Sequence, residues 1–230
     1  MYSATGRSRA NVKLSDDTKV LTVSGVQWDR VRVVEKIKTQ QEIEILLYLA
    51  LLKYDNDPGI YEPTDETLPQ AHIRTLCLDK TKIIKRNDVK RWQSDTWERL
   101  KEIKQLSRVK EQAADLTWSR LRERFNRLAY NRKFLYTKDN NLGIATAKVE
   151  VGDVIALLFG SETPIVLRPL EELNHYEFVA DCYVHGFMDG EALVEARKDS
   201  QPEHDPADVT WLQDPDLGGA VLPIQKFHIH

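Results

Sequence analysis

The chain has 230 residues, of which 41% are hydrophobic and 30% are charged, and its formal net charge is −3. This mixture excludes a disordered or fibrous protein, and the length allows one large domain or two small ones with a buried core. A net charge so close to zero excludes a general attraction of the whole molecule to nucleic acid or anionic lipid.

The first half of the chain predicts one strand followed by helices. In chain order these are a strand over 19–25 and helices over 40–53, about 69–84 and about 95–130. Residues 26–34 could extend the strand, or the chain could turn a corner at Gly25. β-branched residues favour the strand. Two of the helices begin with a capping box, at Thr39–Glu42 and at Asp95–Glu98. The last helix carries an apolar stripe at intervals of three and four residues, which predicts one long amphipathic helix or two joined near 112–115.

At Asn131 the apolar pattern changes from a helical period to an alternation, which is typical of strands. The predicted strands that follow are 133–137, 142–145, 154–159, 163–168, 176–184 and 227–230, with a short helix from about Asp189. Short antiparallel strands joined by tight turns favour a small barrel, because closure removes exposed strand edges.

These elements predict an α+β fold in two regions. Residues 1–130 form a mainly helical region with one N-terminal strand, and residues 131–230 form a small antiparallel β-barrel-like module. We expect the N-terminal and central helices to pack with this module as one compact unit. The strand near 19–25 is a candidate to join its sheet.

The cysteines and the apolar segments indicate the compartment. Cys77 and Cys182 lie far apart in separate apolar segments, which favours free buried thiols in a reducing compartment over a disulfide. The N-terminal residues lack the apolar core of a secretory signal. The longest apolar run, 43–52, has about half the length that crosses a bilayer. We therefore expect a soluble cytoplasmic protein without a membrane segment.

The sequence contains no nucleophile elbow, no Walker loop and no dinucleotide-binding glycine motif. Cys182 and His185 are three residues apart, so in a strand their side chains point to opposite faces. His228 and His230 share one face of a predicted strand and could chelate a metal, but a third ligand is not apparent. We expect no enzyme, no cofactor and no metal site.

His185 lies between a predicted strand and a turn, and two interpretations stay open. It could act as a general base paired with Asp189 or Glu191. It could instead hold the turn by hydrogen bonding backbone groups, which is the interpretation we favour. Asp189 before Gly190 is explained as a helix cap and a turn, and Gly152–Asp153 as a turn.

Several segments carry a resemblance to a known family. In chain order they are Tyr2–Gly6, Leu21–Asp29, Ile73–Cys77, Arg132–Thr137, Leu142–Gly143, Gly152–Asp153, Val166–Arg168 and Tyr183–Ala192. The last segment is the most specific. In this order and at this spacing, the segments resemble the C-terminal region of fungal heterokaryon-incompatibility (HET domain) proteins.

The resemblance implies a non-enzymatic C-terminal module with a regulatory or recognition role in fungal self/non-self recognition and cell death. Its implied partner is a protein, such as a HET-type effector. The tryptophan-glycine and Asp-x-x-Cys-Ile-Asn-Gln type segments of the HET domain do not occur in this sequence, so no cell-death activity and no catalytic residue are carried over. Structural roles in holding the barrel and its turns are implied for Gly152, Asp153, Arg168, Tyr183, His185, Gly186, Asp189, Gly190 and Glu191.

An uneven distribution of charge leaves a second hypothesis open. Residues 80–133 contain 17 Lys and Arg against 7 Asp and Glu, whereas residues 171–230 contain 3 against 13. The two blocks can attract each other within the chain. Alternatively, the basic block could bind nucleic-acid phosphates with an affinity that falls steeply as salt is added. Of the two functions we favour the protein-binding module.

Overall fold

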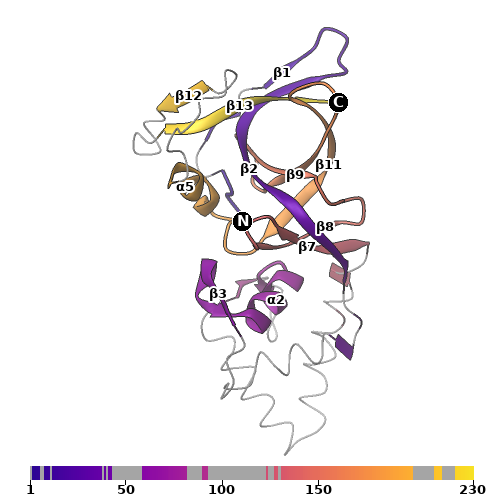
Figure 1. Cartoon of the computed structure of the whole chain (residues 1–230), viewed down its shortest axis with the longest axis vertical. Helices are drawn as coiled ribbons and strands as arrows, with labels where there is room; N and C mark the ends of the chain where they lie inside the picture. Colours follow the sequence, from indigo (N-terminus) through magenta and orange to yellow (C-terminus); the bar gives the residue numbers. More distant parts are fainter. Residues whose placement is uncertain are drawn as a thin grey trace, which may run out of the picture. The chain divides into compact units, whose positions relative to one another are not determined.

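Strands from both ends of the sequence form the main sheet of the protein (Figure 1). In this computed structural model the described residues are 2–5, 8–10, 12–37, 39, 41–42, 59–81, 90–92, 123, 127–128, 131–198, 210–213 and 221–230. The chain divides into two compact units. We call Met1–Glu35 with Leu135–His230 the ring unit, and Lys36–Phe134 the inserted unit.

The sheet has nine strands. They are β1 (Val12–Leu14), β2 (Leu21–Lys36), β7 (Arg132–Thr137), β8 (Leu142–Thr146), β9 (Val154–Leu158), β10 (Ile165–Pro169), β11 (His175–Val184), β12 (Thr210–Gln213) and β13 (Val221–Ile229). Among the pairings whose register is described, the one between β11 and β13 is parallel and the others are antiparallel. The predicted antiparallel sheet is therefore confirmed.

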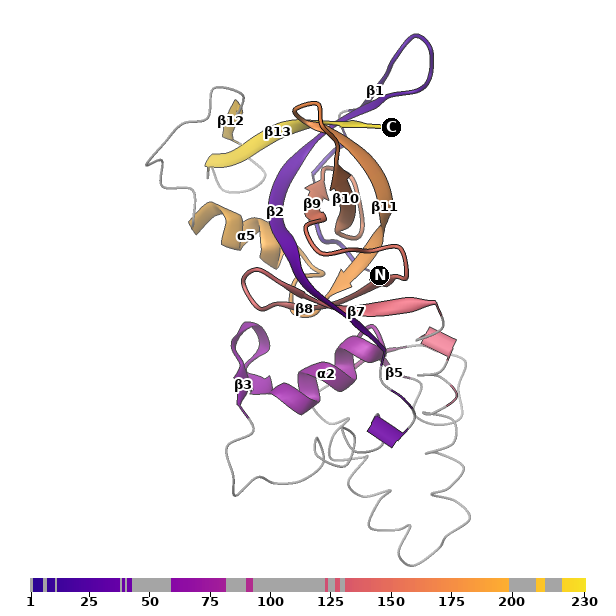
Figure 2. The same cartoon turned by 45° about the vertical axis from the view of Figure 1, so that its right-hand side comes forward.

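The hydrogen bonding of this sheet closes into a ring, which can be followed in Figure 2. The order runs β10-β9-β2-β7-β8-β11, and β11 pairs again with β10. β13 makes a further link because it pairs with both β2 and β11, and β12 pairs with β13. Closure leaves few strand edges free to pair with another chain.

β9 shows how the strands bury one another. All five of its residues are buried. Ile155 and Leu157 belong to one hydrophobic cluster, whereas Val154, Ala156 and Leu158 belong to another. Since successive side chains of a strand point to opposite faces, both faces of β9 are covered. The strand predicted from this continuous apolar run is confirmed.

β2 continues past the strand predicted over 19–25, so the alternative in which residues 26–34 extend it is the one observed. It runs to Lys36 and pairs with β9 and β13, so the N-terminal strand does join the sheet. Gly25 pairs with Leu158, and a Cβ at this glycine would lie 2.5 Å from the Leu157 carbonyl oxygen. Backbone atoms on a paired strand cannot move aside, so a residue without a side chain is required at this point.

The helices contribute less than predicted. The helices with described bounds are η1 (Glu62–Thr64, a 3₁₀ turn), α2 (Leu68–Leu76) and α5 (Glu191–Lys198). The helices predicted over 40–53 and 95–130 lie almost entirely outside the described residues. The described residues do not bear out the expectation that N-terminal and central helices supply the packing of the module. The core of the ring unit comes instead from its strands and loops, with Ala192 and Leu193 of α5.

The inserted unit contains two short hairpins and α2. The hairpins pair β3 (Ile60–Tyr61) with β4 (Glu66–Thr67), and β5 (Lys80–Thr81) with β6 (Lys90–Arg91). A capping box starts α2: Thr67 Oγ1 accepts from the Gln70 amide at 3.4 Å, and Gln70 Oε1 accepts from the Thr67 amide at 3.2 Å. The prediction that this helix reaches 84 is wrong. Leu78 and Asp79 have φ angles of 54° and 51°, a left-handed conformation that no α-helix contains.

Candidate functional site

The residues to which the resemblance assigns structural roles fall into two groups in the ring unit. The first, near the start of β9 and in β10, consists of Gly152, Asp153 and Arg168. The second, at the end of β11 and the start of α5, consists of Tyr183, His185, Gly186, Asp189, Gly190 and Glu191.

Arg168 and Asp153 form a bidentate ion pair. Arg168 Nε donates to Asp153 Oδ1 at 2.9 Å, and Nη2 donates to Oδ2 at 3.0 Å. Nη2 also donates to the Lys148 carbonyl at 3.0 Å and lies 3.4 Å from Glu150 Oε2. The hydrogen bond to Asp153 is the main cause that raises the pKa of Arg168. The Asp153 side chain is 2% exposed and that of Arg168 is 30% exposed, so the carboxylate is the buried partner.

Asp153 also ties its turn to β2. Its Oδ2 accepts from the Glu150 amide at 2.8 Å, which closes the turn. Its carbonyl accepts from the Val31 amide at 2.8 Å, and the Gly152 amide donates to the Val31 carbonyl at 2.9 Å. Asp153 therefore joins three parts of the ring unit: β2, the turn before β9, and β10 through Arg168.

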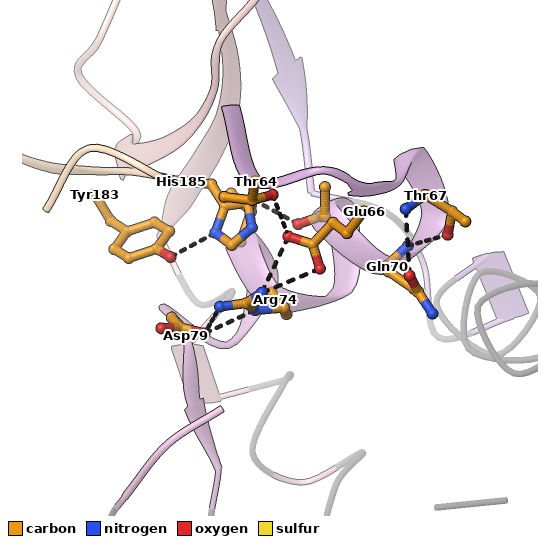
Figure 3. A network of polar contacts seen from close by, with 10 residues as sticks. Thr64, Glu66, Thr67, Gln70, Arg74, Asp79, Tyr183 and His185 are labelled. Carbon is orange, nitrogen blue, oxygen red and sulfur yellow. Dashed lines mark hydrogen bonds and ion pairs between the residues drawn. The ribbon is translucent and has the colours of Figure 1, made fainter. Parts of the chain in front are cut away.

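Tyr183 and His185 form a buried pair at the end of β11 (Figure 3). Tyr183 Oη lies 2.7 Å from His185 Nδ1, within hydrogen-bonding distance. The two residues are 5% and 1% exposed. The His185 amide donates to the Leu142 carbonyl at 2.8 Å, which fixes this turn on β8. These two contacts hold the end of β11 against β8.

The chain then turns into α5. Gly186 and Gly190 have φ angles of 85° and 99°, which a side chain would disfavour. The Gly190 carbonyl accepts from the Leu193 and Val194 amides, so Gly190 begins the helical hydrogen bonding. Glu191 Oε2 accepts from the Asp189 amide at 2.6 Å. Glu191 thus stabilises the turn that leads into α5.

Neither cysteine is disulfide-bonded, and both thiols are buried. Cys182 Sγ lies 3.6 Å from the Pro164 carbonyl, and Cys77 Sγ lies 2.9 Å from the Ile73 carbonyl. Burial, with the charge of Asp181, raises the pKa of the Cys182 thiol far above its ordinary value. A thiol in this state is not a nucleophile near neutral pH.

Two charged groups of the structure have no counterpart in the sequence analysis. Asp29, 7% exposed in β2, accepts from the Arg30 amide at 2.6 Å, and burial raises the pKa of its carboxyl. In the inserted unit, Arg74 donates to Glu66 and to Asp79 at 3.1 and 2.8 Å (Figure 3). Burial alone lowers the pKa of Arg74, but the charges of Asp79 and Glu66 outweigh it and raise the pKa. For Asp29, the sequence signal was its place in the alternating pattern of β2. For Arg74, the signal was a basic residue in the last turn of α2.

The two histidines considered for metal binding meet a third. His228 and His230, at the end of β13, lie against His175 of β11. Within the described part of the chain, however, no group of three or more His, Cys, Asp or Glu side chains is arranged to hold a metal ion. The basic segment 80–133 of the nucleic-acid hypothesis lies largely outside the described residues.

No described helix is long and apolar enough to cross a membrane. No curated protein and no solved structure matches the chain. A family model does match it: the Het-6 beta-barrel domain, over residues 73–201, which is more than half of the sequence. That range contains both groups of motif residues, and it confirms the resemblance to heterokaryon-incompatibility proteins. The chain thus belongs to the Het-6 beta-barrel domain family and is a heterokaryon-incompatibility-related protein.

Proposed function

We propose that the chain is a non-enzymatic module of a heterokaryon-incompatibility-type protein, with a regulatory or recognition role in fungal self/non-self recognition and cell death. It works in the cytoplasm by binding a protein partner, a HET-type effector. The closed hydrogen-bonded ring is the β-barrel of the family and serves as its rigid scaffold. The match of residues 73–201 to the Het-6 beta-barrel domain is the observation that carries this proposal.

The state of the candidate reactive groups supports a binding role over catalysis. Cys182 is buried with a raised thiol pKa, and His185 is 1% exposed and bonded to Tyr183. Asp153 is paired with Arg168. A general base or a nucleophile must reach the atom on which it acts, and these groups are held by neighbours instead.

A direct binding measurement tests the proposal. The full chain is immobilised, and each HET-domain protein encoded in the genome of the same fungus is passed over it. Saturable binding of at least one of them, with a Kd of about 10 μM or tighter, is expected. The absence of binding to all of them would contradict the proposed partner.

Two variants separate binding from catalysis. Cys182→Ala and His185→Gln remove the two groups on which an enzyme would depend. If both variants stay folded and bind as the wild type does, and if cells producing them show the wild-type frequency of cell death after fusion, the non-enzymatic role stands. A folded variant that binds normally but loses the cellular effect would point to catalysis.

A further inference from the structure

Three histidines from two strands form a cluster in the ring unit, separate from the motif residues. His175 Nδ1 lies 2.6 Å from His230 Nε2. The His175 ring stacks on that of His228 at a centroid distance of 4.7 Å, and the centroids of His175 and His230 are 4.9 Å apart. Thr22 of β2 bonds to His228 Nδ1 at 3.0 Å. We call His175, His228 and His230 the histidine cluster.

The cluster covers the short parallel pairing between β11 and β13. That pairing has two positions in register, His175 with His228 and Tyr176 with Ile229. Its backbone bonds run from the His228 amide to the Asn174 carbonyl and from the His230 amide to the Tyr176 carbonyl, each at 2.9 Å. A pairing with so few backbone bonds depends strongly on the side chains above it.

The bond between His175 and His230 requires one nitrogen without a proton. A neutral imidazole has one acceptor nitrogen, whereas an imidazolium donates from both. If one ring is charged, its N–H can still donate to the other. If both rings are charged, two N–H groups face each other across 2.6 Å and the hydrogen bond is lost.

The surrounding charges balance one proton on the cluster but not two. Glu172 Oε1 lies 3.3 Å from His175 Nε2, and this carboxylate can compensate one imidazolium. Two lysines near the cluster oppose this compensation. Lys226 lies two residues before His228 on β13, and Lys13 of β1 pairs with Thr22, which itself pairs with His228. Residues paired in register share a face of the sheet, so Lys13 lies on the face of the cluster.

The pKa of His228 is shifted in the direction that disfavours a further proton on the cluster. Burial, and then the charges of His175 and Lys226, lower the pKa of His228. The folded chain therefore binds fewer protons than the unfolded chain between this lowered value and the ordinary one of 6.5. Its stability falls as the pH falls through that interval.

We propose that the histidine cluster is a pH-sensitive latch, which holds the end of β13 on β11 at neutral pH and releases it on mild acidification. Release breaks the two amide bonds of the parallel pairing. It also uncovers Ile229, which is 7% exposed and packs in the same hydrophobic cluster as Tyr176. The antiparallel pairing of β13 with β2 runs from Gln225 to Ile229, and its part at Gln225–Phe227 bears none of the three rings and remains.

Hydrogen exchange of individual amides, followed by NMR on the full chain at pH 7.5 and 5.5, tests the latch. After correction for intrinsic exchange, the protection of the His228 and His230 amides should fall at the lower pH, because the lowered pKa of His228 makes the folded pairing less stable there. The amide of Val166 in β10 serves as internal reference and should keep its protection.

Matched variants assign the effect to the cluster. His230→Gln and His175→Gln each remove one ring of the hydrogen-bonded pair, and each should lower protection at pH 7.5 and reduce its further loss at pH 5.5. His72→Gln, in the inserted unit, leaves the cluster intact and should keep the full pH effect. Equal protection of the wild-type amides at both pH values would overturn the proposal, as would the same pH-dependent loss in both cluster variants.

Discussion

Arg168 and Asp153 pair through two hydrogen bonds, although the two side chains differ strongly in exposure. The carboxylate is 2% exposed and the guanidinium side chain 30%. Removing one partner therefore leaves the other in a different environment in each case. Arg168 can turn to water, whereas Asp153 remains enclosed with the Glu150 amide as a donor.

Alanine at Arg168 should consequently cost more stability than alanine at Asp153. Arg168→Ala leaves a buried carboxylate without its counter-ion, which costs about 3 kcal/mol or more. Asp153→Ala removes hydrogen bonds to a charged group that water can solvate again, for about 2 kcal/mol. Urea unfolding of the two variants measures both changes in the free energy of unfolding.

A double variant checks the physical reason for this order. Asp153→Asn in the Arg168→Ala background keeps the side-chain volume and removes the buried charge, so it should restore part of the lost stability. Equal losses in the two alanine variants, with no recovery in the double variant, would show that the burial of Asp153 does not decide the energetics.

The sequence was sufficient for the strands because their apolar pattern is local. The apolar run of β9 and the alternation of β7 and β8 specify strands wherever they pack. The sequence left open whether the strand continues past Gly25 or turns there, since the continuation depends on Gly25 lying against Leu157, more than a hundred residues away. Ring closure depends on such long-range pairings as well.

Two glycines should respond very differently to alanine. A Cβ at Gly152 meets nothing within 4 Å, but its φ of +96° disfavours any side chain, so Gly152→Ala should cost about 1–2 kcal/mol from the backbone alone. A Cβ at Gly25 would lie 2.5 Å from a carbonyl oxygen of β9. Gly25→Ala should therefore force the strands apart and cost about 4 kcal/mol or more.

Thermal unfolding of the two glycine variants, at matched protein concentration, is the measurement. The melting temperature of Gly152→Ala should drop by several degrees, whereas Gly25→Ala should fail to give a cooperative transition. A Gly25→Ala variant as stable as Gly152→Ala would contradict the close approach of β2 and β9.

The Tyr183–His185 pair should contribute to stability rather than to chemistry. Tyr183→Phe removes the hydroxyl that reaches His185 Nδ1 and should lower the free energy of unfolding by about 1 kcal/mol. His185→Ala removes the same bond together with a buried ring, so its loss should be larger. Phe178→Tyr, on an exposed residue of the same strand, is the control and should be neutral. Wild-type melting temperatures in both pair variants would refute this role.

The candidate site was predicted unevenly for a similar reason. Gly152–Asp153 and Gly186 were visible because turns have local sequence signals. Arg74, Glu66 and Asp79 were not, since the arginine meets one acid eight residues before it and another five residues after it, which no regular element brings together. His175 meets His228 only through the parallel pairing of β11 with β13.

Both thiols should be silent toward a thiol reagent in the folded protein. Cys77 and Cys182 are 0% and 2% exposed, and the raised pKa of Cys182 keeps its thiol protonated. The chain should consume no dithionitrobenzoate under native conditions and two equivalents after unfolding in guanidinium. Rapid reaction of one equivalent with the native protein would reveal an activated cysteine and revive the enzymatic interpretation.

Asp29 should give the ring unit a specific dependence on pH. Burial raises the pKa of this carboxyl above its ordinary value of 3.8, so the folded chain holds the proton at a pH where the unfolded chain has lost it. The free energy of unfolding therefore falls as pH rises from about 3.8 through the raised value, and the loss is complete above it. Asp29→Asn removes this titration. Relative to wild type, the free energy of unfolding of Asp29→Asn should rise across the interval by about 1.4 kcal/mol for each unit by which the Asp29 pKa is raised.

Asp16→Asn, on an exposed carboxylate, changes the net charge equally and is the control. Its free energy of unfolding in urea should run parallel to that of the wild type between about pH 4 and 7. If Asp29→Asn also runs parallel, burial does not shift the Asp29 proton.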